Sequence, residues 1–67
     1  MKTIEKTLID RAEKLSAEWG NTGFIVENKD GTLEATVWNN WKWEFPQRPV
    51  VASVDRGGWL FEKGYNR

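Results

Sequence analysis

The sequence predicts a small α+β fold: an N-terminal helix packed on a strongly twisted antiparallel β-meander of four to five strands, which can curl into a small barrel. Three observations carry this prediction. Apolar residues recur at helical spacing up to Trp19, the period changes to two after Gly20, and five tryptophans occur among 67 residues. A chain of this length accommodates one domain, which we expect to span residues 1–67.

The first segment carries a single apolar stripe at three- and four-residue spacing: Ile4, Leu8, Ala12, Leu15 and Trp19. Such a stripe is typical of a helix that packs on a core. Thr3 has a side chain suited to cap the helix N-terminus, and Gly20 is a natural stop at its other end. The helix is therefore predicted over residues 3–19, with Trp19 in the core.

Alternating polarity and turn residues predict strands over 23–27, 32–38, 41–45, 50–54 and 59–63. Asn28 to Gly31 form the first turn, and two loop lengths compete there. A four-residue loop pairs Glu27 with Thr32 and keeps the apolar residues on one face. A three-residue loop opposes Val26 to Glu34 and scatters them, so the pattern favours the four-residue loop.

The next turn falls at Asn39-Asn40. A three-residue loop from Trp38 to Asn40 keeps the apolar faces of the flanking strands together, whereas a two-residue turn separates them. A single bent strand preserves the same parity but is unusually long. The segment from Pro46 to Pro49 then interrupts the pairing, and residues 64–67 are expected to form a loose tail.

This arrangement assigns each strand residue to a face of the sheet. The predicted inner face holds Phe24, Val26, Leu33, Ala35, Val37, Trp41, Trp43, Phe45, Val50, Ala52, Val54, Trp59 and Phe61. The predicted outer face holds Glu27, Glu34, Thr36, Lys42, Glu44, Ser53 and Glu62, with Ile25, Val51 and Leu60 as apolar exceptions. One helix is too narrow to cover five strands, so either the sheet closes on itself or part of the aromatic face meets a partner.

Composition excludes several functions. Cysteine and histidine are absent, which excludes disulfides, the common zinc sites and catalytic triads that contain either residue. The formal net charge is zero, unlike that of a duplex-DNA binder. No apolar run is long enough for a membrane span, and no signal peptide is visible. We therefore expect a cytoplasmic protein that is not an enzyme and uses no cofactor.

The segment from Trp38 to Trp43 is the most distinctive motif, because aromatic residues are interleaved with asparagine and lysine. Trp38 alone among its tryptophans falls on the outer face or in the turn, which makes it the first candidate for a contact residue. The complete set of candidate contact residues is Trp38, Asn39, Asn40, Lys42, Arg48 and Arg56. Pro46 and Pro49 also match a polyproline ligand pattern, although a rigid connector is the simpler interpretation.

The function favoured by these observations is non-catalytic binding of another protein, as a small inhibitor or regulator. A compact chain of this kind suits a phage or mobile element, for example as an inhibitor of a host defence enzyme. One alternative is a single-stranded nucleic-acid binder, in which Trp38 stacks on a base while Lys42, Arg48 and Arg56 contact phosphates. A second alternative is a structural homodimer.

Overall fold

The computed structural model describes residues 2–38 and 48–67. It confirms the α+β class. In chain order the elements are β1 (Lys2–Thr3), α1 (Lys6–Trp19), β2 (Gly23–Glu27), β3 (Leu33–Val37), β4 (Val50–Asp55), β5 (Gly58–Phe61) and β6 (Tyr65–Asn66). The predicted strand over 41–45 lies outside the described residues.

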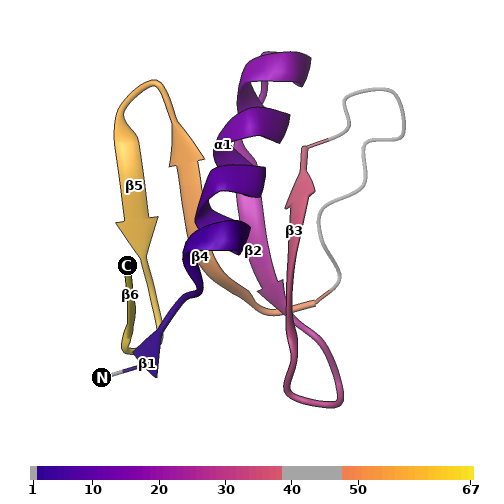
Figure 1. Ribbon diagram of the computed structural model, residues 1–67, viewed down its shortest axis with the longest axis vertical. Coiled ribbons are helices and arrows are strands. Elements are labelled where there is room, and N and C mark those ends of the chain that lie inside the picture. Colours follow the sequence, from indigo (N-terminus) through magenta and orange to yellow (C-terminus); the bar gives the residue numbers. More distant parts are fainter. Residues whose placement is uncertain (1, 39–47) are drawn as a thin grey trace.

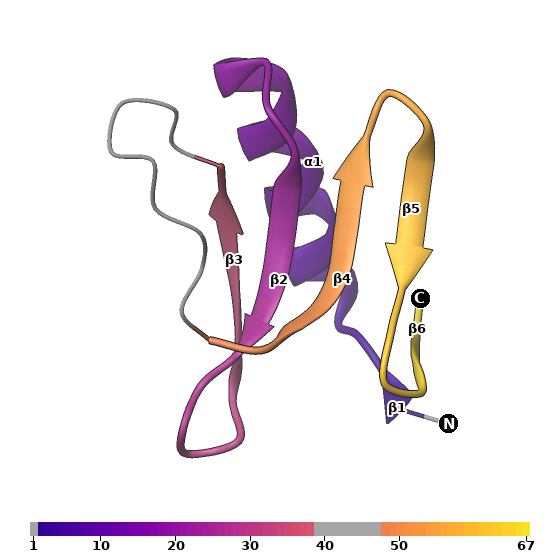
Figure 2. The same ribbon diagram turned by 180° about the vertical axis from the view of Figure 1, so that it is seen from behind.

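Strands β2 to β5 form one antiparallel sheet in the order β3-β2-β4-β5. The order is not that of a simple meander, because β4 pairs with β2 and not with β3. Helix α1 packs against one face of this sheet (Figure 1), and Figure 2 shows the opposite face, from which the helix lies behind the strands. The sheet stays open, with β3 and β5 as its edges among the described strands, and does not close into a barrel.

The hairpin between β2 and β3 differs from the expected register. Val26 pairs with Glu34 and Glu27 with Leu33, which is the register of the three-residue loop that the apolar pattern disfavoured. The backbone N–H of Asn28 donates to the carbonyl of Thr32 at 2.8 Å, so the loop is one residue shorter than expected. Asp30 stabilises this tight loop, because its Oδ1 accepts hydrogen bonds from both the backbone N–H and the hydroxyl of Thr32. The change of register reverses the face of β2 relative to β3, so that Ile25, and not Phe24 or Val26, lies opposite Ala35 in the core.

A β-bulge in β4 corrects a second face assignment. Ile25 pairs with Ala52 while Val26 pairs with Val50, which leaves Val51 as an extra residue. Val51 is wholly buried within the core cluster, although its parity placed it on the outer face. Val50 instead lies opposite Val26, on the other side of the sheet from Ile25. Beyond the bulge the predicted face assignment is correct, because Ala52 and Val54 are buried.

The core lies between α1 and the sheet. Its buried members are Ile4, Ile9, Ala12, Ile25, Ala35, Val51, Ala52 and Val54. Close contact of helix and sheet depends on Gly23, since a Cβ atom there would lie 2.6 Å from the carbonyl oxygen of Ala12. The helix stripe was incompletely predicted, because Ile9 is buried whereas Trp19 is 52% exposed. Trp19 is the last helical residue, next to the chain reversal at Gly20 (φ 65°).

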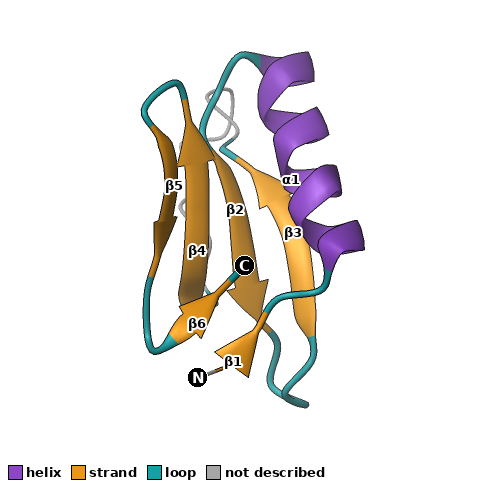
Figure 3. Cartoon of the chain, turned by 60° about the vertical axis from the view of Figure 1, so that its left-hand side comes forward, coloured by secondary structure: helices purple, strands orange, loops and turns teal. Residues whose placement is uncertain are grey.

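The helix begins later than predicted because the first residues join a second small sheet. Strand β1 pairs in parallel with β6 (Figure 3), so residues 65 and 66 are not a loose tail. The backbone N–H of Ile4 donates to the carbonyl of Asn66 at 2.8 Å, which holds this segment extended. Glu5 therefore occupies the N-cap position in place of Thr3, without a side-chain capping bond.

Candidate functional site

A surface pocket of about 930 Å³ opens at the C-terminal end of α1. We call it the helix-end pocket. Its helix wall is formed by Glu13, Ser16, Ala17 and Gly20. The small side chains of Ser16, Ala17 and Gly20 leave room beside the helix. The negative end of the helix dipole lies at the C-terminus of α1, on the Gly20 side of this wall. No basic residue occupies the last helical turn to offset that partial charge.

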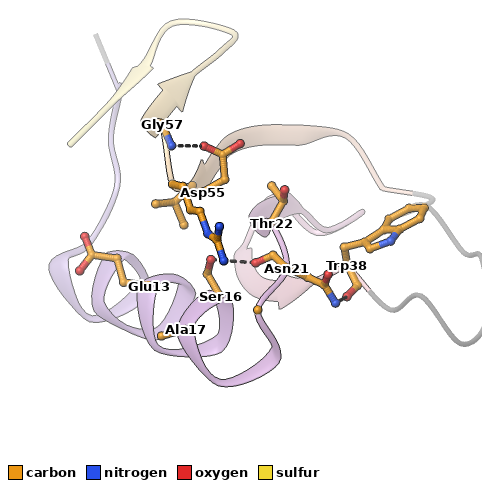
Figure 4. A pocket seen from close by; sticks show the side chains of 11 residues that line it. Glu13, Ser16, Ala17, Asn21, Thr22, Trp38, Asp55 and Gly57 are labelled. Atoms are coloured by element: carbon orange, nitrogen blue, oxygen red, sulfur yellow. Dashed lines mark hydrogen bonds between the residues drawn. The ribbon is translucent and has the colours of Figure 1, made fainter.

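The opposite wall comes from β4 and the turn that follows it, Val54 to Gly57. Asn21, Thr22 and Trp38 complete the pocket. Figure 4 shows Glu13 and Trp38 at its two ends, with Asn21 and Thr22 between them. The pocket thus combines a charged end with an aromatic end.

Local hydrogen bonds hold both walls in place. The Oδ1 atom of Asp55 accepts the backbone N–H of Gly57 at 2.7 Å, which orders the turn that carries Arg56. At the other end, the backbone N–H of Trp38 donates to the carbonyl of Thr22, and Asn21 Nδ2 donates to the carbonyl of Trp38 at 3.2 Å. These hydrogen bonds hold the backbone of Trp38, which carries the indole, in place.

The helix end is tied to the same network. The hydroxyl of Ser16 donates to the carbonyl of Asn21 at 2.7 Å, and the carbonyl of Ser16 accepts the N–H of Gly20 at 2.9 Å. Helix, Asn21 and the end of β3 therefore form one continuous hydrogen-bonded unit. Because the backbone around the pocket is ordered in this way, a ligand would meet a largely preformed surface.

The structure brings together two of the predicted contact residues and separates a third from them. Trp38 is half-buried and Arg56 is exposed, and both line the helix-end pocket. Arg48 lies near the opposite end of the sheet, where its Nη1 donates at 2.6 Å to both Glu34 Oε2 and Asn28 Oδ1. Asn39, Asn40 and Lys42 lie outside the described residues.

Several pocket residues were missed by sequence reasoning. Ser16 lies within the predicted helix and Asn21 in the short segment between that helix and the first predicted strand, so neither carried a signal for a site. Asp55 lies between two predicted strands, and its Oδ1 accepts the backbone N–H of Gly57 in the turn that joins them. Only the pairing of β4 with β2 brings the turn at 55–57 close to the helix end, and the strand order was not predictable from sequence.

The charged end of the pocket also takes part in the fold. Glu13 Oε1 accepts a hydrogen bond from Trp59 Nε1 at 2.9 Å and lies 3.7 Å from the guanidinium of Arg67. Within residues 2–38 and 48–67, no three acidic side chains gather in a way that could hold a metal ion. The chemistry that the pocket offers is therefore hydrogen bonding, ion pairing and aromatic contact.

No protein-family model, curated protein or solved structure matches this chain. In the described part of the chain, no helix has the length and apolar character needed to cross a membrane.

Proposed function

We propose that this protein is a small non-catalytic binding protein that acts through protein–protein contact at the helix-end pocket, as an inhibitor or regulator of its partner. One observation carries the proposal: Trp38 and Arg56, both expected from sequence to make contacts, line the same pocket although they follow two different strands, β3 and β4. Tryptophan and arginine are the residue types most enriched among those that dominate binding energy.

The chemistry of the pocket supports a protein partner. It combines a half-buried indole with carboxylates, a guanidinium and amide groups, which resembles the mixture found at non-obligate protein interfaces. The hydrogen bonds around Asn21 and Asp55 order both walls in advance. An ordered surface loses less conformational entropy on binding, which favours affinity from a small contact area.

The single-stranded nucleic-acid alternative draws less support from this geometry. It requires cations beside the stacking residue, yet Arg48 is paired with Glu34 at the far end of the sheet. Glu13 and Asp55 line the pocket together with Arg56, and these carboxylates would oppose a phosphate. A protein partner accommodates both signs of charge. The role as an inhibitor in the cytoplasm, encoded by a phage or mobile element, belongs to this proposal. Its phage or mobile-element origin is suggested only by the small size and simplicity of the chain.

An affinity pull-down from cells of the source organism tests the proposal. The protein and its Trp38→Ala variant are used in parallel, with Trp19→Ala as a matched control. Trp19 is an exposed tryptophan that does not line the pocket, so its loss removes a similar aromatic surface elsewhere. We expect a protein that is retained by the parent chain and Trp19→Ala but lost with Trp38→Ala. Equal retention by all three would refute the assignment of the pocket.

A further inference from the structure

Strand β5 is an edge of the four-stranded sheet, at the left in Figure 1, and no described strand pairs with its other side. Two observations show which residues of β5 direct their backbone N–H and C=O groups to β4. Leu60 pairs with Ser53, and the N–H of Glu62 donates to the carbonyl of Val51 at 2.9 Å. Hydrogen-bonded positions alternate along an antiparallel ladder. Leu60 therefore directs its backbone groups to β4, while those of Trp59 and Phe61 point away from the sheet.

This edge lacks most of the features by which natural sheets prevent association. Exposed edges are usually blocked by a very short strand, by lysine or proline, by a bulge or by an inward-pointing charge, and of these β5 has only its short length of four residues. Strand β5 reads Gly58-Trp59-Leu60-Phe61 and contains none of the blocking residues, and its pairing with β4 is regular. Leu60 is also 61% exposed, the more exposed of the two large apolar side chains at the described surface. An unblocked apolar edge is a template for a further strand.

The edge is also rigid. The rings of Trp59 and Phe61 stack with their centroids 5.5 Å apart on the side that packs against the core. The indole of Trp59 is held by its hydrogen bond to Glu13, and the guanidinium of Arg67 lies 5.9 Å from the ring centroid. Because β5 is already ordered, pairing with a further strand costs β5 little additional conformational entropy.

We propose that β5 pairs with β5 of a second copy, antiparallel about a two-fold axis through Leu60. In this register Trp59 of each copy faces Phe61 of the other, and all the outward backbone groups of these two residues are used. Registers centred on Trp59 or Phe61 would instead need inter-strand hydrogen bonds from the backbone of Gly57 or Lys63, which lie outside β5. The axis is perpendicular to the sheet, so two four-stranded sheets join as one with both helices on the same side.

The side chains and charges suit this pairing. The two Leu60 residues face each other at a non-hydrogen-bonded position, where side chains approach most closely, and each covers the other. Antiparallel pairing places the Asp55-Arg56 end of one strand beside the Glu62-Lys63 end of the other. Each end carries one charge of each sign, and the whole chain has a net charge of zero, so long-range repulsion between copies is minimal.

Disulfide trapping tests this register directly because the chain contains no cysteine. The Cα atoms of residue 60 in the two copies should lie about 4.5–5.5 Å apart, within the range that a disulfide spans. Leu60→Cys should form a covalent dimer rapidly under mild oxidation. The matched control is Thr36→Cys, which places a thiol on the same side of the sheet but on the other edge strand. Equal rates of cross-linking for both variants would overturn the proposal.

Sedimentation of the unmodified chain gives an independent measure that does not depend on a thiol. We expect a concentration-dependent monomer–dimer equilibrium that Leu60→Lys shifts to monomer and Thr36→Lys leaves unchanged. Both variants add the same charge, and circular dichroism checks that each remains folded. A monomer at every concentration, or disruption by Thr36→Lys alone, would refute pairing through β5. The proposal is independent of the helix-end pocket, so it can fail while the proposed function stands.

Discussion

The indole Nε1 of Trp59 donates a 2.9 Å hydrogen bond to Glu13 Oε1, across 46 residues of sequence. This contact joins β5 to the middle of α1. The guanidinium of Arg67 lies near the same carboxylate and over the same ring, so the end of the chain is attached at this point as well. One glutamate thus connects the helix, an edge strand and the last residue described, and the same glutamate lines the helix-end pocket.

Two replacements of Glu13 separate the contribution of its hydrogen bond to stability from the contribution of its charge. We expect Glu13→Ala to lower the free energy of unfolding by about 0.5–1 kcal/mol, because the bond is lost at a half-exposed site. Glu13→Gln keeps an oxygen acceptor for the indole and should remain close to the parent stability. Urea denaturation of the three proteins measures the difference. Equal losses in both variants would show that the ion pair, and not the hydrogen bond, is the stabilising contact.

Gly23 should be intolerant of a side chain. A Cβ there meets the backbone oxygen of Ala12 at 2.6 Å and Val54 Cγ1 at 3.3 Å, so the helix must move away from the sheet. We expect Gly23→Ala to cost about 2–3 kcal/mol, at the upper end of the usual cost of overpacking. Gly31→Ala is the control. It has a positive φ of 88° but open space around it, and should cost about 1 kcal/mol. A smaller loss at residue 23 than at residue 31 would contradict the close packing.

The single tyrosine provides a pH-dependent probe of the β1–β6 pair. The hydroxyl of Tyr65 donates to Glu27 Oε2 at 2.7 Å, and this hydrogen bond raises the pKa of the tyrosine above its ordinary value. The folded state therefore holds this proton more tightly than the unfolded state does. The resulting stabilisation is fully present below about pH 10 and is lost as the pH rises through the folded-state pKa.

Spectroscopic titration of tyrosinate formation measures that pKa without interference, because no other tyrosine is present. The expected result is a higher pKa in the folded chain than in urea, with the difference reduced in Glu27→Gln. A pKa that Glu27→Gln leaves unchanged would rule out the hydrogen bond to Glu27 as its cause.

Arg48 is expected to contribute to stability and not to partner binding. Its guanidinium joins Glu34 and Asn28 at the base of the β2–β3 hairpin, with both charged side chains about half-exposed. Arg48→Ala should therefore lower the free energy of unfolding by no more than about 1 kcal/mol, and less at high salt. Denaturation at two salt concentrations tests this, and pull-down with the same variant should retain the partner. Loss of the partner would show that the contact surface lies around Arg48 and not at the helix-end pocket.

Sequence reasoning succeeded where a local pattern determined the structure. The stripe over Leu8, Ala12 and Leu15 indicated the helix, Gly20 ends it with a left-handed φ of 65°, and β2 and β3 lie within a residue of their expected bounds. Trp59 and Phe61 pack against the core as their parity indicated. In each case the residues that determine the structure are neighbours in sequence.

It failed where a one-residue change of register or a distant contact decided the outcome. The bonds from Thr32 to Asp30 stabilise a three-residue hairpin loop in place of the expected four-residue loop, and the bulge at Val51 shifts β4. Ile25 and Val51 therefore enter the core against their expected parity. The parallel pairing of β1 with β6 joins the two ends of the described chain and has no local signature. The helix-end pocket was predictable only in part, because Trp38 was a candidate from sequence whereas its neighbours depend on strand order.

The dissociation constant for the captured partner tests the central claim most directly. It is measured by titration calorimetry for the parent chain, Trp38→Ala and Trp19→Ala. If the helix-end pocket is the contact surface, Trp38→Ala should weaken binding by about tenfold or more, as expected for an aromatic anchor. Trp19→Ala should change it by less than about twofold, as expected for an exposed residue outside the contact. Affinity unchanged by Trp38→Ala, or weakened only by Trp19→Ala, would contradict the account.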